Sequence, residues 1–399
     1  MPDQPAKETA ISGIQLNLRI ISTVIFNFSS YLTIGLPLAV LPGYVHDVMG
    51  FSAFWAGLVI SLQYVSTLIS RPHAGRYADL WGPKKVVIFG LFGCLLSGLF
   101  YGAAALTSDN AVLSLTLLCV GRLILGVGQS FAGTGSTLWG VGAVGSLHIG
   151  RVISWNGIFT YGAMAIGAPL GVVLYRYGGL MLLAETIVAI IVVSVALAWP
   201  RPAVKGSKGK PIPFRDVLGK ILPYGLILAM ASAGFGVIAT FITLFYQDKG
   251  WEGAAFALTL FSAAFVGTRL LFPNAINRRG GLFVAMACCA VEALGLFLVW
   301  GAWDPLIAKT GALLTGAGFS LVFPAIGVEA VKVVPTQNQG SALATYTAFM
   351  DLSLGITGPL AGLIMSVAGV PVVYLLTALL VCLAFYMILR LKQPNRAAA

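Results

Sequence analysis

The sequence predicts an all-α, polytopic membrane protein with 12 transmembrane helices in two pseudo-symmetric six-helix bundles. Of its 399 residues, 58% are hydrophobic and only 9% are charged, and the mean hydropathy is +0.92. Soluble domains carry about 25% charged residues, so this chain has too little polar surface for water. Its apolar runs are continuous, whereas the strands of a transmembrane barrel would alternate apolar and polar residues.

Apolar runs separated by charges or turn-forming residues mark the spans. From run length, the first six are expected at about 19–42, 53–72, 86–106, 111–138, 152–175 and 179–199. The second six are expected at about 217–246, 254–274, 281–302, 306–330, 340–366 and 370–390. The polar first seventeen residues lack the features of a signal peptide, so the first helix is expected to remain as the insertion signal. The predicted domains are an N-terminal bundle (1–199), a cytoplasmic linker rich in Pro, Gly and Lys (200–216), and a C-terminal bundle (217–399).

The Lys and Arg residues predict the orientation. When the twelve spans are threaded with the N-terminus inside, all but four of the 24 basic residues lie inside. Arg176, Lys249 and Lys309 lie outside, and Arg122 lies within a span. The positive-inside rule therefore predicts a multi-pass protein of the cell (inner) membrane with both termini in the cytoplasm. These bases are scattered over short loops, so the net charge of +11 does not indicate a nucleic-acid partner.

The two halves repeat short patterns in the same order, which indicates an internal duplication. The matched segments are 71–82 with 269–280, 123–131 with 313–321, and 167–171 with 357–361. In the first pair, Arg71 corresponds to Arg269 and Asp79 to Asn277. The third pair aligns GAPLG with TGPLA.

The loop GRYADLWGPKK (75–85) carries a specific resemblance. It is similar to the loop 2–3 signature of the major facilitator superfamily of secondary transporters, and the resemblance covers essentially the whole chain. The matching residues are Gly75, Asp79, Gly82, Lys84 and Lys85. The departures are Leu80, in place of a basic residue, and Pro83, which moves the basic pair one place along. The resemblance implies two bundles that rock against each other by alternating access.

Residues at the inner ends of helices 2, 8 and 10 are expected to form a conformational latch. The two glycines of the loop would allow close helix approach and a tight turn, while Asp79 would pair with nearby arginines and face the positive end of helix 11. Glu329 is expected to pair with Arg269 or Arg278 as a second latch. The alternative is a loop that only sets topology. The predicted latch comprises Arg71, Gly75, Asp79, Gly82, Lys84, Lys85, Arg269 and Glu329.

Ionisable residues inside spans are costly and are therefore functional candidates. Arg122 opens a segment that resembles the helix 4 signature of the superfamily, whose Arg is associated with proton coupling. Asp351 is expected near mid-depth in helix 11. We expect Asp351 to carry the proton, with Arg122 as the cation that opposes the effect of burial on this carboxyl. A structural role for either residue is the alternative. Glu292, Glu329 and Glu185 are weaker candidates.

Helix 5 resembles the antiporter motif of exporting members, with Ala168 where Gly usually precedes the Pro. Gly162, Gly167 and Gly171 are expected to let helices 5 and 8 touch, and Pro169 is expected to bend the helix. The resemblance implies export, although ordinary close packing would explain the same glycines. The candidate cavity residues are Asn27, Tyr31, Gln63, Tyr64, Gln129, Asn156, Tyr161 and Tyr346.

The sequence holds no pattern that predicts an enzyme or a pump. It has no GxxxxGK[ST] loop, its three histidines are far apart, and its cysteines lack metal-site spacing. We expect no catalytic residue, metal or cofactor, with transport driven by a proton gradient. The resemblance implies proton-coupled export of small organic molecules, either drugs or sugar-like metabolites. The first alternative is a proton-linked importer of a sugar or organic acid. A non-transporting receptor or a channel ranks below it. The expected partners are a small-molecule substrate, protons and membrane lipid, and we expect a monomer.

Overall fold

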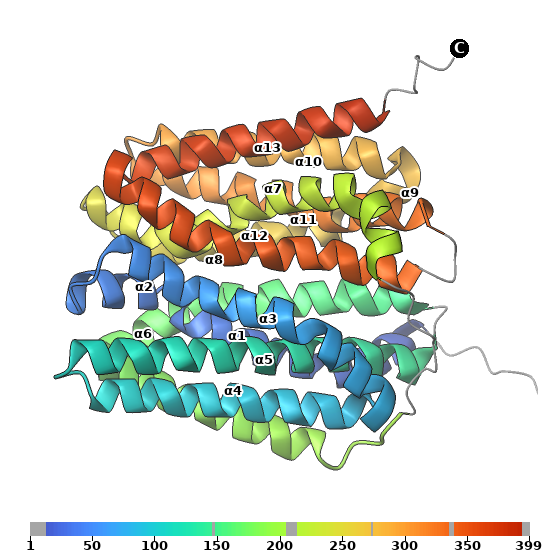
Figure 1. The fold of residues 1–399 in the computed structure, drawn as a ribbon, viewed down its shortest axis with the longest axis horizontal. Coiled ribbons are helices and arrows are strands. Elements are labelled where there is room, and N and C mark those ends of the chain that lie inside the picture. The colour runs from blue at the N-terminus through green and yellow to red at the C-terminus, as the bar shows by residue number, and fades with distance from the viewer. Residues whose placement is uncertain (1–12, 146–147, 205–213, 273, 335–338, 393–399) are drawn as a thin grey trace, which may run out of the picture.

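The chain folds into a bundle of long helices that lie roughly parallel to one another (Figure 1). The computed structural model describes residues 13–145, 148–204, 214–272, 274–334 and 339–392. The first half contains α1 (Gly13–Leu38), α2 (Leu41–Gly43), η1 (Tyr44–Val48), α3 (Ala53–Trp81), α4 (Pro83–Leu106), α5 (Ala111–Val144) and α6 (Ile149–Ala198). The second half contains α7 (Phe214–Asp248), α8 (Ala254–Leu271), α9 (Ala275–Arg279), α10 (Gly281–Trp300), α11 (Pro305–Lys332), α12 (Gln339–Ala368) and α13 (Val370–Lys392). We call the end where α1 begins and α13 ends the terminal end.

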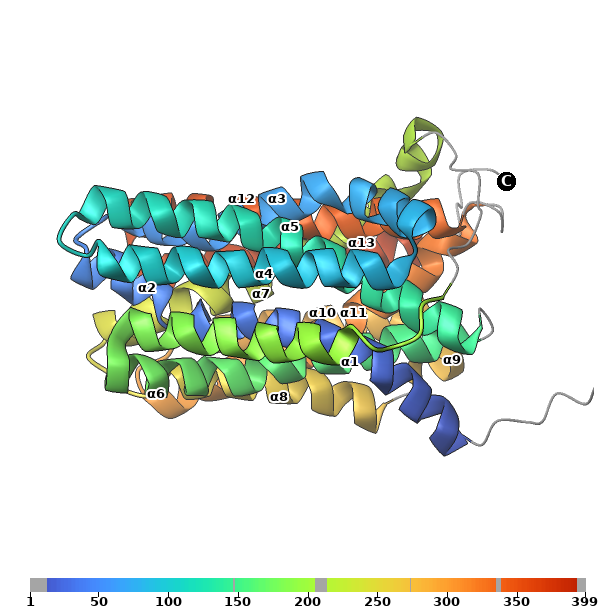
Figure 2. The same cartoon turned by 90° about the horizontal axis from the view of Figure 1, so that it is seen from below.

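Helix α6 crosses the bundle twice, which confirms the expected twelve spans. Among the described residues, 11 helices are long and apolar enough to cross a membrane, and α6 counts once among them although it has 50 residues. Its path breaks at Gly178 and Gly179, where Gly179 adopts a φ of +62° that favours glycine. The segment before the break packs on α1, and the segment after it packs on α4. Figure 2 shows α6 as two green helices joined at one end.

The two halves meet along two seams, α3 against α12 and α6 against α8 (Figure 1). Gly57 and Gly358 bring α3 and α12 together so closely that a Cβ on either would collide with the backbone of the other. The hydroxyl of Ser61 on α3 donates a hydrogen bond of 3.2 Å to a carbonyl of α12. Thr259 on α8 donates a matching bond of 3.1 Å to the carbonyl of Ala165 on α6. Ser61 and Thr259 precede the matched arginines of the repeat by the same interval, so the two seams are built alike.

The helix 5 glycines do not join α6 to α8, which corrects the sequence-based prediction. Gly167 and Gly171 lie against the backbone of α1 at Gly35 and Leu36. Residues four apart share one face of a helix, so these two glycines face α1 together. A different face of α6 meets α8. Its contact residues, also four apart, are Gly157, Tyr161 and Ala165.

Candidate functional site

A bidentate ion pair joins the two halves towards the terminal end. Arg71 Nε on α3 donates to Asp351 Oδ2 at 2.6 Å, and Arg71 Nη2 donates to Asp351 Oδ1 at 3.0 Å. The Asp351 side chain is 3% exposed, whereas that of Arg71 is 26% exposed. Two parallel bonds from a planar guanidinium to a carboxylate form the strongest common geometry for such a pair. The pair therefore fastens the α3–α12 seam.

Arg122 does not meet Asp351, so the partner predicted from the sequence is wrong. Arg122 Nε and Nη2 donate to the carbonyl oxygens of Val59 and Ile60 at 3.1 and 3.2 Å. Arg122 lies about 17 Å along α5 from the non-terminal end, whereas Asp351 lies about 26 Å along α12 from that end. The α12 helix has 30 residues, more than the roughly 20 that a bilayer requires, so counting from its start placed Asp351 too near mid-depth. Arg122 instead holds α5 against α3 within one half.

The second predicted latch also has different partners. Glu329 pairs with Lys332 at 2.9 Å and accepts a hydrogen bond from the Gly281 backbone N–H at the start of α10. Neither Arg269 nor Arg278 binds it. Arg269 Nε and Nη2 donate to the Ser320 carbonyl at 3.3 Å. Glu329 therefore caps a helix within the C-terminal half.

The structure describes part of the loop signature. Gly82 has a φ of +86° and turns α3 into α4, as expected. Gly75 has open space where a Cβ would stand, so close helix approach does not explain it. Lys84 Nζ donates at 2.6 Å to the carbonyl of Trp199 within the same half, and Lys85 is exposed. The side chain of Asp79 lies outside what the structure describes.

The predicted cavity residues separate into groups. Tyr31 and Tyr64 are partly buried and lie within electrostatic reach of Asp351. Asn27 Nδ2 donates to Thr160 Oγ1 at 2.9 Å and lies within 3.5 Å of the Asn156 carbonyl, which links α1 to α6.

The remaining predicted cavity residues differ in their hydrogen bonding. Gln129 accepts a hydrogen bond of 3.2 Å from Thr67. The Tyr346 hydroxyl bonds to the Phe323 carbonyl at 3.0 Å inside the C-terminal half. Among the described side chains, the buried oxygens of Asn27, Gln63 and Asn156 have no hydrogen-bond partner.

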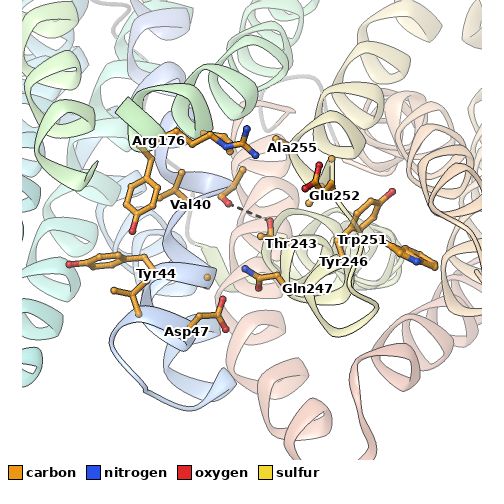
Figure 3. A pocket seen from close by; sticks show the side chains of 17 residues that line it. Val40, Tyr44, Asp47, Arg176, Thr243, Tyr246, Gln247, Trp251, Glu252 and Ala255 are labelled. Atoms are coloured by element: carbon orange, nitrogen blue, oxygen red, sulfur yellow. Dashed lines mark hydrogen bonds between the residues drawn. The ribbon is translucent and has the colours of Figure 1, made fainter. Parts of the chain in front are cut away.

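A cavity of about 500 Å³ opens between the halves at the end opposite the termini (Figure 3). Its floor is crossed by a weak bond of 3.5 Å from Thr243 of α7 to the carbonyl of Ala39. Three charged side chains line this cavity, namely Asp47, Arg176 and Glu252. None of them forms an ion pair within the part of the chain that the structure describes. Sequence reasoning missed this site, because its residues lie near the helix ends where polar side chains are ordinary. The α3–α12 seam thus carries its ion pair towards the terminal end, whereas nearer the other end its backbones touch at Gly57 and Gly358, and the cavity opens at that end.

This arrangement of two six-span halves, with an interdomain ion pair at one end and a cavity at the other, agrees with the comparisons to known proteins. The family model of the Major Facilitator Superfamily matches residues 23–357. The chain belongs to this superfamily. It is therefore a multi-pass secondary transporter rather than an enzyme.

Three close relatives share one name. The chain is 73% identical over 393 residues to the MFS-type transporter YhhS of Shigella flexneri, covering 98% of this chain and 97% of the relative. It is 72% identical to YhhS of Escherichia coli K12 with the same coverage. For YhhS of Salmonella enteritidis the identity is 70% over 398 residues, covering 100% and 98% of the two chains.

Solved structures share the fold at low sequence identity. A D-xylose–proton symporter superposes with a TM-score of 0.76 at 14% identity, covering 92% of this chain and 97% of that one. The human organic anion transporter MFSD10 superposes with a TM-score of 0.72 at 15% identity, covering 93% and 99%. These likenesses establish the superfamily fold alone.

Proposed function

We propose that this superfamily member is a proton-coupled exporter that works by alternating access, with its terminal end in the cytoplasm. The observation that carries the proposal is the Arg71–Asp351 pair, because it joins the two halves through a group that can bind a proton. A ligand shifts a conformational equilibrium only by its different affinity for the two states. A proton meets this condition at Asp351, since protonation removes the charge that holds Arg71.

The pair supplies a physical link between protonation and opening. While Asp351 is ionised, the bidentate pair favours the conformation that is closed at the terminal end. A proton that reaches Asp351 through the opposite cavity would release Arg71 and allow the terminal end to open. Release of that proton into the cytoplasm would let the pair form again. Each cycle would then carry a proton inward.

Export rests on the helix 5 segment around Pro169, which resembles the motif of exporting members. The substrates we propose are small organic molecules, either drugs or sugar-like metabolites. An importer of a sugar or organic acid would use the same pair, and then substrate and proton would move in the same direction. The energy source is the proton gradient, and the proposal needs no cofactor.

The test is substrate-driven proton movement in liposomes that contain the purified protein. An entrapped pH dye reports proton movement while a panel of drugs and sugars is presented, with wild type, Asp351→Asn and Arg71→Gln compared. We expect a substrate to drive protons in the opposite direction in wild type, and we expect Asp351→Asn to abolish this coupling. Coupling that survives in Asp351→Asn would show that the pair is structural. Movement of protons with the substrate would replace export by symport.

A further inference from the structure

The repeat places a carboxylate beside one of two matched arginines but not beside the other. Arg71 corresponds to Arg269, and the aligned GAPLG and TGPLA segments make Tyr161 the counterpart of Asp351. Arg71 is bound by the Asp351 carboxylate. Arg269 instead has Tyr161 within electrostatic reach. A tyrosine hydroxyl carries no charge at neutral pH, so among the described residues the α6–α8 seam has no anion to match Asp351 of the α3–α12 seam.

The described contacts of Arg269 leave Nη1 of its guanidinium without a hydrogen-bond acceptor. Nε and Nη2 share the Ser320 carbonyl at 3.3 Å, and the guanidinium carbon lies 4.8 Å from the Phe265 ring centre. Nη1 faces Gly157 on α6, where a Cβ would collide with the guanidinium. No acidic side chain among those described pairs with Arg269.

Arg269 lies in the last turn of α8, where the carbonyl end of a helix favours a cation. Arg269 is only partly buried and stands at the seam where the two halves meet. Its planar fork of donors matches a carboxylate in two parallel bonds. A ligand with a negative group would therefore complete this seam as Asp351 completes the other.

Aromatic rings surround the same place. Phe265 stacks on Tyr161 at 3.4 Å between ring centres and lies 5.9 Å from Phe319. Phe235 and Phe261 extend the cluster. All five side chains are buried, and Tyr161 of the N-terminal half covers the four rings of the C-terminal half, so opening of the seam would expose an apolar wall beside a cation.

We propose that Arg269 is the anion-binding residue of the substrate site and that the substrates are aromatic or otherwise amphipathic organic anions. The carboxylate or sulfonate of the substrate binds the guanidinium, and its apolar body packs against the rings of Phe265, Phe319 and Tyr161. The substrate class rests on the proposed transport function, but binding itself needs no proton gradient.

The test compares two probes that share a ring system and differ in charge. Binding of 1-naphthoate and of its neutral amide, 1-naphthamide, is measured by titration calorimetry with the purified full chain. We expect wild type to bind naphthoate at least tenfold more tightly than naphthamide. Arg269→Gln should remove this preference, and Arg269→Lys should keep part of it. The matched control is Arg278→Gln, which removes an exposed arginine near the same end of the bundle and should keep the preference in full.

Gly157→Ala tests the same site without removing the charge. The added methyl group must displace the guanidinium, so naphthoate binding should weaken while naphthamide binding stays the same. Equal affinity of wild type for the two probes, or binding of neither, would overturn the proposal even if no variant folds. An unchanged preference in a folded Arg269→Gln protein would also overturn it. Naphthoate binding without any substrate-driven proton movement would overturn the proposed proton coupling alone, and proton movement without charge preference would overturn the anion site alone.

Discussion

Arg71 and Asp351, which are 280 residues apart in the chain, form two parallel hydrogen bonds across the seam between the halves. Ser61 and Gly358 lie further along the same seam, where the helix backbones touch. The ion pair therefore adds to a contact between α3 and α12 that backbone packing already forms. Because it is charged and titratable, the pair is the part of the seam that a proton would release under the proposed function.

Breaking one side of the pair should cost more than removing both sides. Arg71→Gln leaves a buried carboxylate without its cation, and such a loss costs about 3–5 kcal/mol. Arg71→Gln combined with Asp351→Asn should be closer to wild type, since it leaves no charge behind. Thermal unfolding in detergent at fixed pH measures both. Equal losses in the single and double variants would contradict the buried pairing.

The terminal end should open when the pair is neutralised. Asp351→Asn should raise the reactivity of a cysteine introduced at Ser61, which is buried on α3 and bonds across the seam to α12. A membrane-impermeant maleimide measures this in a background without native cysteines. Lower pH should have the same direction of effect in wild type and none in Asp351→Asn. A reactivity that ignores both changes would show that another contact holds this end closed.

The helix 5 glycines provide a matched pair for testing packing. Gly171→Ala would collide with the backbone of α1 at Leu36, while Gly162→Ala would meet open space. Overpacking costs about 1–3 kcal/mol, so Gly171→Ala should lower the melting temperature. Gly162→Ala should leave it unchanged or raise it, since alanine favours helix over glycine by about 0.5–1 kcal/mol. Size-exclusion chromatography after heating measures both, and equal behaviour would show that α1 and α6 separate easily.

Arg122 should matter for stability more than for coupling. Its bonds to the carbonyls of Val59 and Ile60 are charge-assisted, and each is worth about 1.5–3 kcal/mol. Arg122→Met should therefore lower the melting temperature, while the protein that remains folded keeps its ratio of protons to substrate. Flux in liposomes, normalised to folded protein, measures that ratio. A normal melting temperature with lost coupling would assign Arg122 to the proton path.

Glu292 should tolerate loss of its charge. This side chain is fully buried on α10, and neither carboxylate oxygen has a hydrogen-bond partner among the described residues. An unsatisfied buried polar group costs about 1–3 kcal/mol, so Glu292→Met should raise the melting temperature. Glu292→Gln should leave proton flux intact. Loss of flux in a stable Glu292→Gln protein would instead place a second proton site in the C-terminal half.

The repeat explains how much of the site was predictable. Spacing alone matched Arg71 with Arg269, and the structure puts both at equivalent places on the two seams. The same alignment, extended back by six residues, pairs Asp351 with Tyr161, although the sequence analysis expected Glu329 as the carboxylate beside Arg269. The partners of Arg269 and Glu329 were not predictable, because each pairs within its own half through helix rotations that spacing does not specify.

The sequence by itself determined the twelve spans, the two-half repeat and the superfamily, because apolar length and motif spacing are local properties of the chain. The tertiary structure decided that Asp351 meets Arg71 and that Arg122 stays inside one half. A contact between helices depends on their relative height and rotation. A shift of one turn is about 5 Å, which exceeds the reach of a hydrogen bond. Height is set by packing at glycines such as Gly358, and no count from a helix start can supply it.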